Sequence, residues 1–315
     1  MTRIGNSPGF STWQPLPGWT PTPDVLRETL DGGQAFRWAL DPGAAATPPR
    51  CVWTGTWSTH CVQLQLSDAG LHWRSSTGTT TADLHRYLAH DLDWTALTNS
   101  LPWRSDAHLA HCIAAFPDLR ILRQPFGETL LGFLCSATKQ IVQIKQMVAL
   151  LAERHGTSTC RAESPNPASA AFGDAALQSN QLPTWKQLAR IPEKNLRSCL
   201  LGFRARYISE TAKFLATRPG WLDETEALPY PAAKTRLMEL PGVGEKVADC
   251  VLLFGAGKLE AFPVDTWVLK SLARRYGLDG WKPAQVAHFG RTHFGPLAGL
   301  AQQYLFAWER KFGGR

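Results

Sequence analysis

The sequence of 315 residues lacks several features that would each assign it to a class of protein. No apolar run approaches the roughly 20 residues that a membrane-spanning helix needs, so no membrane partner is expected. The first residues, Met1 to Gly9, lack the apolar core of a signal peptide. The seven cysteines are scattered without the spacing of a metal site, which predicts reduced thiols in a cytosolic compartment. No basic nuclear-targeting tract is present.

Acidic residues are also in deficit. The chain has 26 Asp and Glu against 33 Lys and Arg, and its formal net charge of +7 favours an anionic partner such as nucleic acid. Hydrophobic residues make up 44% of the chain, which is ample for a core. The length allows two or three domains.

The most informative segment runs from Leu240 to Cys250 and reads Leu-Pro-Gly-Val-Gly-Glu-Lys-Val-Ala-Asp-Cys. Gly242 and Gly244 can leave backbone N–H groups uncovered, and the apolar spacing after them predicts a helix. Free amides at a helix N-terminus bind anions, so the turn Gly242-Val243-Gly244 is predicted to bind a DNA phosphate. A hairpin that merely packs two helices is the alternative; the preceding Leu-Pro and the following Lys246 favour DNA binding.

Lys246 and Asp265 are the candidate catalytic pair. Lys246 falls in the first turn of the predicted helix, where a cation opposes the helix dipole, which favours the neutral, nucleophilic amine. Asp265 precedes a second predicted helix, Thr266 to Ala273, for which it is also a good N-cap. An amine nucleophile with one oriented carboxylate suits cleavage of the bond between sugar and base in DNA. Taken singly, a lysine is usually a solvated charge and an aspartate here is usually a cap.

Residues 234–267 resemble the helix-hairpin-helix, Gly-Pro-Asp motif of the base-excision DNA glycosylase superfamily. Further strings resemble its 8-oxoguanine DNA glycosylase/AP lyase branch, and they occur in order along nearly the whole chain: Leu30–Trp38, Leu134–Ser136, Ile141–Ile144, Leu201–Tyr207 and Ala298–Phe306. The Lys-Val-Ala-Asp-Cys and Gly-Gln-Ala-Phe-Arg-Trp strings are the most specific. No cysteine follows Cys250, which excludes the C-terminal four-cysteine iron–sulfur cluster of the relatives that resemble endonuclease III.

The resemblance implies an α+β fold, in which an N-terminal antiparallel β-sheet domain with helices (TBP-like) precedes an all-α helix-hairpin-helix glycosylase core. The expected parts are an N-terminal extension, the β domain and the helical region, at residues 1–23, 24–106 and 107–315. Within the last, residues 157–181 are expected to be a flexible insert, and residues 234–267 to hold the hairpin and catalytic motif.

Hydrophobic alternation and periodicity agree with this division. Alternation predicts four strands, at Gln34–Trp38, Cys51–Trp57, Cys61–Leu66 and Leu71–Arg74. A helix is also predicted at Leu84–Leu92, and from Ala107 onward the signal turns helical, with its longest stretches at residues 126–134 and 140–155.

The resemblance implies a bifunctional enzyme that flips 8-oxoguanine, or a related oxidised purine, out of duplex DNA. Lys246 would attack the sugar through a Schiff base and cut the strand 3′ to the abasic site by β-elimination, while Asp265 stabilises the cationic sugar. No cofactor or catalytic metal is implied, although the carbonyls of Met238, Leu240 and Val243 are candidates for a monovalent cation. The expected partner is double-stranded DNA containing oxidised guanine. A monomer is expected, in the cytoplasm of a prokaryote, associated with the nucleoid, or in the nucleus of a eukaryote.

The base pocket is also assigned by resemblance. 8-Oxoguanine carries a hydrogen on N7 where guanine has a lone pair, and the Gly33 carbonyl would accept it. Cys250 and Phe306 would stack on the two faces of the base, and Gln302 would read its Watson–Crick edge. Gln303 competes for that role if the alignment shifts by one residue. The ordinary alternatives are a β-turn at Gly33 and core packing for the others.

The residues that would face the opposite strand depart from the family pattern. Where the family has a run of asparagines, this chain has Ala137-Thr138-Lys139-Gln140, and an arginine that reads cytosine becomes Gln143. Arg204 is kept, and its planar donor fork suits a cytosine. Trp267 replaces a common phosphate-binding histidine. Thr138, Gln143 and Arg204 are candidate DNA contacts, but strict preference for cytosine is not expected.

Two other functions stay open. A glycosylase of the same fold for alkylated bases would use water and the aspartate alone, and Lys246 argues against it. A non-catalytic helix-hairpin-helix DNA-binding protein would have no need of Lys246, Asp265 and Cys250 together. Replacing Lys246 separates all three functions.

Overall fold

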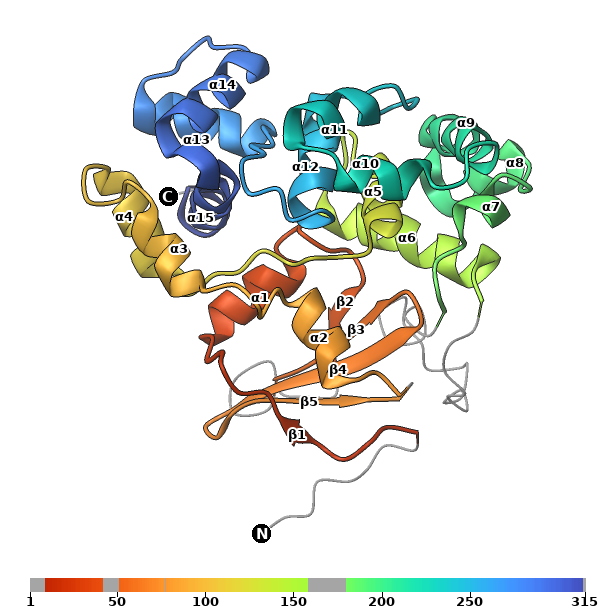
Figure 1. Cartoon of the computed structure of the whole chain (residues 1–315), viewed down its shortest axis with the longest axis horizontal. Helices are drawn as coiled ribbons and strands as arrows, with labels where there is room; N and C mark the ends of the chain where they lie inside the picture. The colour runs from red at the N-terminus through yellow and green to blue at the C-terminus, as the bar shows by residue number, and fades with distance from the viewer. Residues whose placement is uncertain (1–8, 42–50, 77, 158–179, 314–315) are drawn as a thin grey trace.

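The computed structural model describes residues 9–41, 51–76, 78–157 and 180–313. Figure 1 shows a β-sheet with helix α2 at one end of the molecule and most of the helices gathered at the other. The α+β fold with an antiparallel sheet ahead of a helical core is therefore confirmed. None of the helices in these described ranges has the length and hydrophobicity that a transmembrane segment needs.

The sheet has five antiparallel strands in the order β1-β5-β4-β3-β2. The strands are β1 Gln14–Pro15, β2 Trp38–Leu40, β3 Cys51–Trp57, β4 His60–Ser67 and β5 Gly70–Ser75. Strands predicted at 51–57, 61–66 and 71–74 are confirmed as β3, β4 and β5. Part of the expected N-terminal extension joins the sheet, since β1 pairs with β5 at its edge.

The strand predicted at Gln34–Trp38 is wrong over residues 34–37, because β2 begins only at Trp38. The Gln34 side chain donates to the Arg120 carbonyl at 2.8 Å and accepts the Leu122 amide at 3.0 Å. Gln124 in turn donates to the Gln34 carbonyl at 2.6 Å. Bonds to the segment 120–124 therefore take the place of a β-ladder at Gln34.

The helices follow the periodicity closely where the stretches are long. Helices predicted at 126–134 and 140–155 are confirmed as α5 and α6. The helices of the N-terminal part are α1 Pro23–Asp31, α2 Thr81–Tyr87 and α3 Trp94–Ser100. Those of the core are α4 Ala107–Ala115, α5 Phe126–Leu134, α6 Ile141–His155, α7 Trp185–Leu188, α8 Glu193–Leu196, α9 Arg204–Ala216, α10 Trp221–Ala227, α11 Tyr230–Leu237, α12 Glu245–Phe254, α13 Thr266–Tyr276, α14 Pro283–Phe294 and α15 Ala298–Phe312.

Two short segments complete the described chain, a kinked one at Arg197–Leu201, where Leu200 has φ +62°, and the 3-10 turn Gly295–Leu297. In Figure 1, α13 to α15 and α7 to α9 form two groups on either side of α10, α11, α12 and α5. Of the predicted flexible insert at 157–181, residues 158–179 lie outside the described residues, as do residues 1–8 of the predicted extension. The domain boundaries stay predictions.

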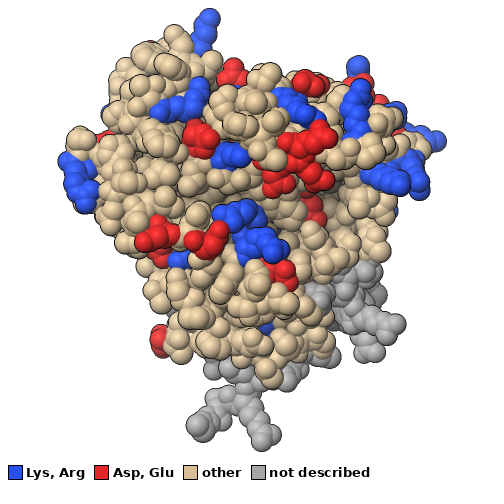
Figure 2. Space-filling view, viewed as in Figure 1, with Lys and Arg blue, Asp and Glu red and all other residues tan. Residues whose placement is uncertain are grey.

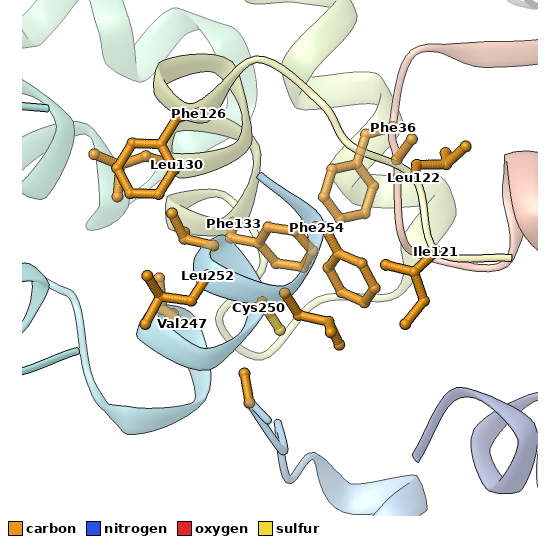
Figure 3. Packing of buried hydrophobic residues seen from close by; sticks show 14 of the residues in the cluster. Phe36, Ile121, Leu122, Phe126, Leu130, Phe133, Val247, Cys250, Leu252 and Phe254 are labelled. Carbon is orange, nitrogen blue, oxygen red and sulfur yellow. The ribbon is translucent and has the colours of Figure 1, made fainter. Parts of the chain in front are cut away.

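Three phenylalanines join the sheet-bearing part to the helical core (Figure 3). The Phe36 ring meets Phe133 of α5 edge-on at 5.1 Å between centroids, and Phe133 stacks on Phe254 of α12 at 5.6 Å. Each ring is at least nine-tenths buried, which stabilises the fold by about 1.5–3 kcal/mol per side chain. Gly33 lies three residues before Phe36, so this packing fixes the Gly33 turn relative to α5 and α12.

Candidate active site

Lys246 lies in the first turn of α12, which begins at Glu245, as predicted. Its Nζ donates to the Ser136 Oγ at 3.1 Å and lies 5.2 Å from the centroid of the Phe133 ring. The Ser136 hydroxyl donates in turn to the Phe133 carbonyl at 2.7 Å. The amine is therefore held at a fixed place over the end of α5 instead of extending into solvent.

The sequence did not indicate Ser136 as a site residue, because its partner Lys246 is 110 residues away along the chain. Ser136 is 7% exposed and follows the C-terminus of α5. Its only signal in the sequence is its place in the Leu-Cys-Ser string. A local pattern cannot show which side chain a buried hydroxyl accepts from.

Asp265 is the N-cap of α13, which confirms the capping prediction. Its Oδ1 accepts the backbone amides of Trp267 at 2.9 Å and Val268 at 2.8 Å. Burial raises the pKa of the Asp265 carboxyl above its ordinary value, and these two bonds together with the charges of Lys246 and Arg310 oppose that rise. The carboxylate is thus directed by its cap and lies within electrostatic reach of the amine.

Cys250 lies one turn beyond Lys246 in α12 and is 4% exposed. Burial raises the pKa of the Cys250 thiol to about 12, and the nearby charge of Lys246 opposes the rise. Figure 3 shows this side chain among the core residues next to Phe254. It therefore presents a neutral, polarisable sulfur beside the amine.

Gly33 and Phe306 lie next to each other, although 273 positions separate their numbers in the sequence. Gly33 has φ +107°, and a Cβ on it would lie 3.9 Å from Cε1 of Phe306 and 3.0 Å from Cδ1 of Ile141. The positive φ and the close neighbours both favour glycine at this position. The turn and α15 are thus brought together as the predicted pocket requires.

Gln302 and Gln303 are both buried in α15. Gln303 Nε2 donates to Gln302 Oε1 at 2.6 Å, so the two amides are bonded to each other in the structure. Gln302 precedes Phe306 by one helical turn, which places both on one face of α15. The reading role of Gln302 stays a prediction.

The hairpin between α11 and α12 presents a glycine turn at its tip. Gly242 has φ +80°, and a Cβ there would collide with the Tyr207 ring at 2.6 Å. Val243 is 6% exposed and anchors the turn, whereas Gly244 is exposed and has open space around its Cβ position. The N-terminus of α12, with amides that have no partner within the helix, is accessible for an anion.

The backbone carbonyls considered for a monovalent cation belong to the same hairpin. Leu240 and Val243 are buried and Met238 is exposed, and the Leu240 carbonyl already accepts the Val243 amide at 3.1 Å. Carbonyl oxygens suit hard cations, and a second lone pair stays available on Leu240. A cation at this turn stays a prediction.

The candidate residues for the opposite strand are arranged differently. Arg204 is only 3% exposed, and its guanidinium donates to the Thr138 Oγ1 at 3.0 Å, to the Leu201 carbonyl at 3.3 Å and to the Ala137 carbonyl. Thr138 has φ +55°, an uncommon backbone conformation for a β-branched residue. Exposed Gln143 accepts the Gln140 amide at the start of α6. Their contacts with DNA stay predictions.

The surface charge is mixed on the face shown in Figure 2. Lys and Arg are interspersed there with Asp and Glu, and a central group of cations has acidic residues on both sides. The net charge of +7 therefore does not form a uniform basic field on this face.

Comparison with known proteins gives two family matches. Residues 22–130 match the model for the 8-oxoguanine DNA glycosylase N-terminal domain. Residues 132–292 match the model for HhH-GPD superfamily base excision DNA repair proteins. Together these two regions cover strands β2 to β5, the hairpin and the candidate catalytic pair.

Individual relatives agree with these matches. The chain is 40% identical over 119 residues to a probable N-glycosylase/DNA lyase of Methanothermobacter thermautotrophicus, a match that spans 38% of each protein. It is 29% identical over 320 residues to the N-glycosylase/DNA lyase OGG1 of Arabidopsis thaliana, covering 96% of this chain and 81% of that protein. Among solved structures, the Clostridium acetobutylicum 8-oxoguanine glycosylase/lyase bound to dsDNA containing cytosine opposite to 8-oxoG has a TM-score of 0.78 at 27% identity, covering 91% of this chain and 92% of that one.

Proposed function

We infer the function from one premise: the chain belongs to the HhH-GPD superfamily of base excision DNA repair proteins, and it carries an 8-oxoguanine DNA glycosylase N-terminal domain before that region. The protein is a bifunctional N-glycosylase and AP lyase that excises 8-oxoguanine from double-stranded DNA. The observation that carries this assignment is the Lys246 amine, bonded to Ser136 and within electrostatic reach of the capped Asp265.

Lys246 is the proposed nucleophile. A neutral amine has two N–H groups and one lone pair, so donation of one N–H to Ser136 leaves the lone pair available for the sugar. The amine attacks C1′ of the deoxyribose as the bond to the base breaks, and the base leaves with that electron pair. Opening of the sugar ring gives an imine, and loss of a C2′ proton then expels the 3′ phosphate by β-elimination.

Asp265 is proposed to stabilise the positive charge that develops on the sugar. Its carboxylate is directed by the Trp267 and Val268 amides, so little reorganisation is needed when the charge appears. The same role requires the ionised form. Because burial raises the pKa of Asp265, the loss of activity in acid should begin above the ordinary range for aspartate.

The flipped base is proposed to bind between Cys250 and Phe306, with Gln302 at its Watson–Crick edge. The Gly33 carbonyl would accept a hydrogen bond from N7–H of 8-oxoguanine. The same carbonyl would be repelled by the lone pair on N7 of guanine. Support comes from the neutral thiol of Cys250 beside Lys246 and from the closeness of Phe306 to the Gly33 turn.

The DNA backbone is proposed to bind at the hairpin turn, Gly242 to Gly244, through the free amides of α12. Monomeric action on duplex DNA is expected, in the nucleoid of a prokaryote or the nucleus of a eukaryote. Thr138, Gln143 and Arg204 are the proposed contacts to the opposite strand, and they are not proposed to select the base there. Because the Arg204 guanidinium is bonded within the chain, strict preference for an opposite cytosine is not expected.

Borohydride trapping tests this proposal directly. Wild-type protein is incubated with a labelled duplex that contains one 8-oxoguanine opposite cytosine, beside Lys246→Gln. A cross-linked band that disappears in the variant supports both the nucleophile and the lesion. Base release without a cross-link would point to a water-activating glycosylase and make Lys246 a phosphate contact. If neither occurs, the lesion assignment is wrong.

A further inference from the structure

The Gly32-Gly33 turn lies between two helices that are far apart in the sequence. One is α6, which begins at Ile141, and the other is the last helix, α15. Each helix presents an apolar residue to Gly33 and a cation one helical turn later: Ile141 with Lys145, and Phe306 with Arg310. In each pair the spacing i, i+4 puts the two side chains on one helix face.

On the α15 side, Arg310 binds the turn itself. Its Nη1 donates to the Gly32 carbonyl at 2.7 Å and to both carboxylate oxygens of Glu28, at 3.0 and 3.1 Å. The Glu28 side chain is 14% exposed, so this pair is largely screened from water. Burial raises the pKa of the Glu28 carboxyl, and the charge of Arg310 opposes that rise. One guanidinium thus joins α15, α1 and the backbone of the turn.

On the α6 side, Lys145 holds the other end of the turn. Its Nζ donates to Oδ1 of Asp31 at 2.7 Å, with both side chains half-buried. Asp31 is the last residue of α1 and directly precedes Gly32. Ile141, one turn earlier in α6, limits the space beside Gly33. The turn therefore has a cation on each side, bonded to the residue before Gly32 and to Gly32 itself.

The effect of these pairs is geometric more than energetic. The partly exposed Lys145–Asp31 pair contributes little to stability, on the order of 1 kcal/mol or less. The more buried Arg310–Glu28 pair is tested with both of its charges removed. A hydrogen-bond acceptor, however, loses most of its discrimination when it moves by about 1 Å, because both length and angle deteriorate. The Gly33 residue has no side chain to hold it in place, so its neighbours must fix the carbonyl.

We propose that Lys145 and Arg310 are positioning residues that fix the Gly33 carbonyl between α6 and α15, and so set the rate at which 8-oxoguanine is excised. This inference rests on the proposed function of the same pocket. It assigns no contact with DNA to either cation.

The test compares two reactions of the same protein. Base excision from an 8-oxoguanine duplex needs the Gly33 carbonyl, whereas strand cleavage at a preformed abasic site needs Lys246 but no base. Single-turnover rates of both are measured for wild type, Lys145→Met, Arg310→Met and the double variant. Both rates are measured above neutral pH, where Asp265 stays ionised without the charge of Arg310. Excision is expected to fall about 10-fold for each single variant and about 100-fold for the double, with abasic-site cleavage within about twofold of wild type.

Lys311 supplies a matched control, because its Nζ also bonds α1 from α15, at 2.7 Å from Asp24, but does not touch the turn. Lys311→Met should keep both rates. The charge exchange Asp31→Lys with Lys145→Asp should recover excision that Lys145→Asp alone loses. Arg310→Met is also made together with Glu28→Gln, because the Glu28 carboxylate would otherwise be buried without its partner. Thermal unfolding of each variant is measured to show that it folds.

Several outcomes overturn the inference. Excision and abasic-site cleavage that fall together would mean a general structural role, as would a Lys311→Met defect equal to that of Arg310→Met. Unchanged excision in the double variant would remove the positioning role while leaving the proposed function intact. A wild type that cleaves abasic sites but does not excise 8-oxoguanine would overturn both.

Discussion

The two sides of the candidate DNA site differ in what their polar groups bind. On the lesion side, Lys246, Asp265 and the Gly33 turn are each held by bonds to residues behind them, and their reactive atoms stay available. On the opposite-strand side, the cation Arg204 is itself buried and bonded to Thr138 and two carbonyls. Under the proposed function, the groups that act on the lesion would already be oriented in the free protein, whereas an arginine contact with the partner base would need rearrangement.

The difference has a physical cause. Preorganised groups accelerate a reaction because they need not be reoriented when charge develops. A contact with the undamaged partner base does not touch the bond between sugar and damaged base, so its presence or absence need not change the rate at which that bond breaks. Changes on the lesion side should therefore alter rates, and changes on the opposite-strand side should mainly alter stability.

The largest effect is expected for Asp265→Asn. Asparagine is also a good N-cap, so α13 should keep its cap while the negative charge is lost. Excision should fall by about 10²–10³-fold, as for the loss of one electrostatic stabiliser. Single-turnover excision at pH 7.5 measures this.

The stability of the same variant provides a second check. The folded pKa of Asp265 is raised, so the stabilisation that comes from its proton is present at low pH and lost as the pH rises through the folded pKa. The wild type at neutral pH has lost it, and the uncharged asparagine should be as stable or more stable there. Thermal unfolding at neutral pH would contradict this if the variant were clearly less stable.

Arg204→Met should remove the hydrogen bonds that hold the opposite-strand side together. The Leu201 and Ala137 carbonyls lose their donor, which should lower the free energy of unfolding by about 2–3 kcal/mol. The ratio of excision rates opposite cytosine and opposite adenine should change by less than about threefold, because Arg204 is bonded within the chain. Urea unfolding and paired single-turnover assays measure both. A collapse of the ratio with little loss of stability would show that Arg204 turns to read cytosine.

Ser136→Ala tests whether the hydrogen bond from Lys246 to Ser136 orients the amine on the lesion side. Without its hydroxyl, the Lys246 amine loses its fixed partner, and excision should fall about 10-fold while the borohydride-trapped product still forms. The yield and rate of trapping at saturating enzyme measure this. An unchanged rate would mean that the Phe133 ring and the surrounding packing orient the amine without the serine.

The smallest effect is expected for Thr138→Asn. A β-branched residue at φ +55° is strained, and asparagine accepts this conformation more readily, so the variant should gain about 0.5–1 kcal/mol of stability. Its side-chain oxygen can still accept from Arg204. Urea unfolding measures the gain, with excision as a control that should stay near wild type. A less stable variant would mean that the threonine hydroxyl matters more than the backbone strain.

The sequence alone determined the elements whose signals are local. Long apolar periodicity predicted α5 and α6, alternation predicted β3 to β5, and the glycine turn predicted the hairpin that carries Lys246. The capping role of Asp265 followed from its place before a helix. These features depend on residues a few positions apart, which a pattern can show.

The tertiary structure alone decided which side chains hold the site in place. Gln34 is not in the predicted strand because its side chain is hydrogen-bonded to residues 86 and 88 positions further along the chain. The hydrogen-bond partner of Lys246 likewise lies 110 positions away in the sequence. Lys145 and Arg310 reach the Gly33 turn across 114 and 278 residues. Buried polar groups must find hydrogen-bond partners wherever the fold supplies them, and no local periodicity records where those partners are.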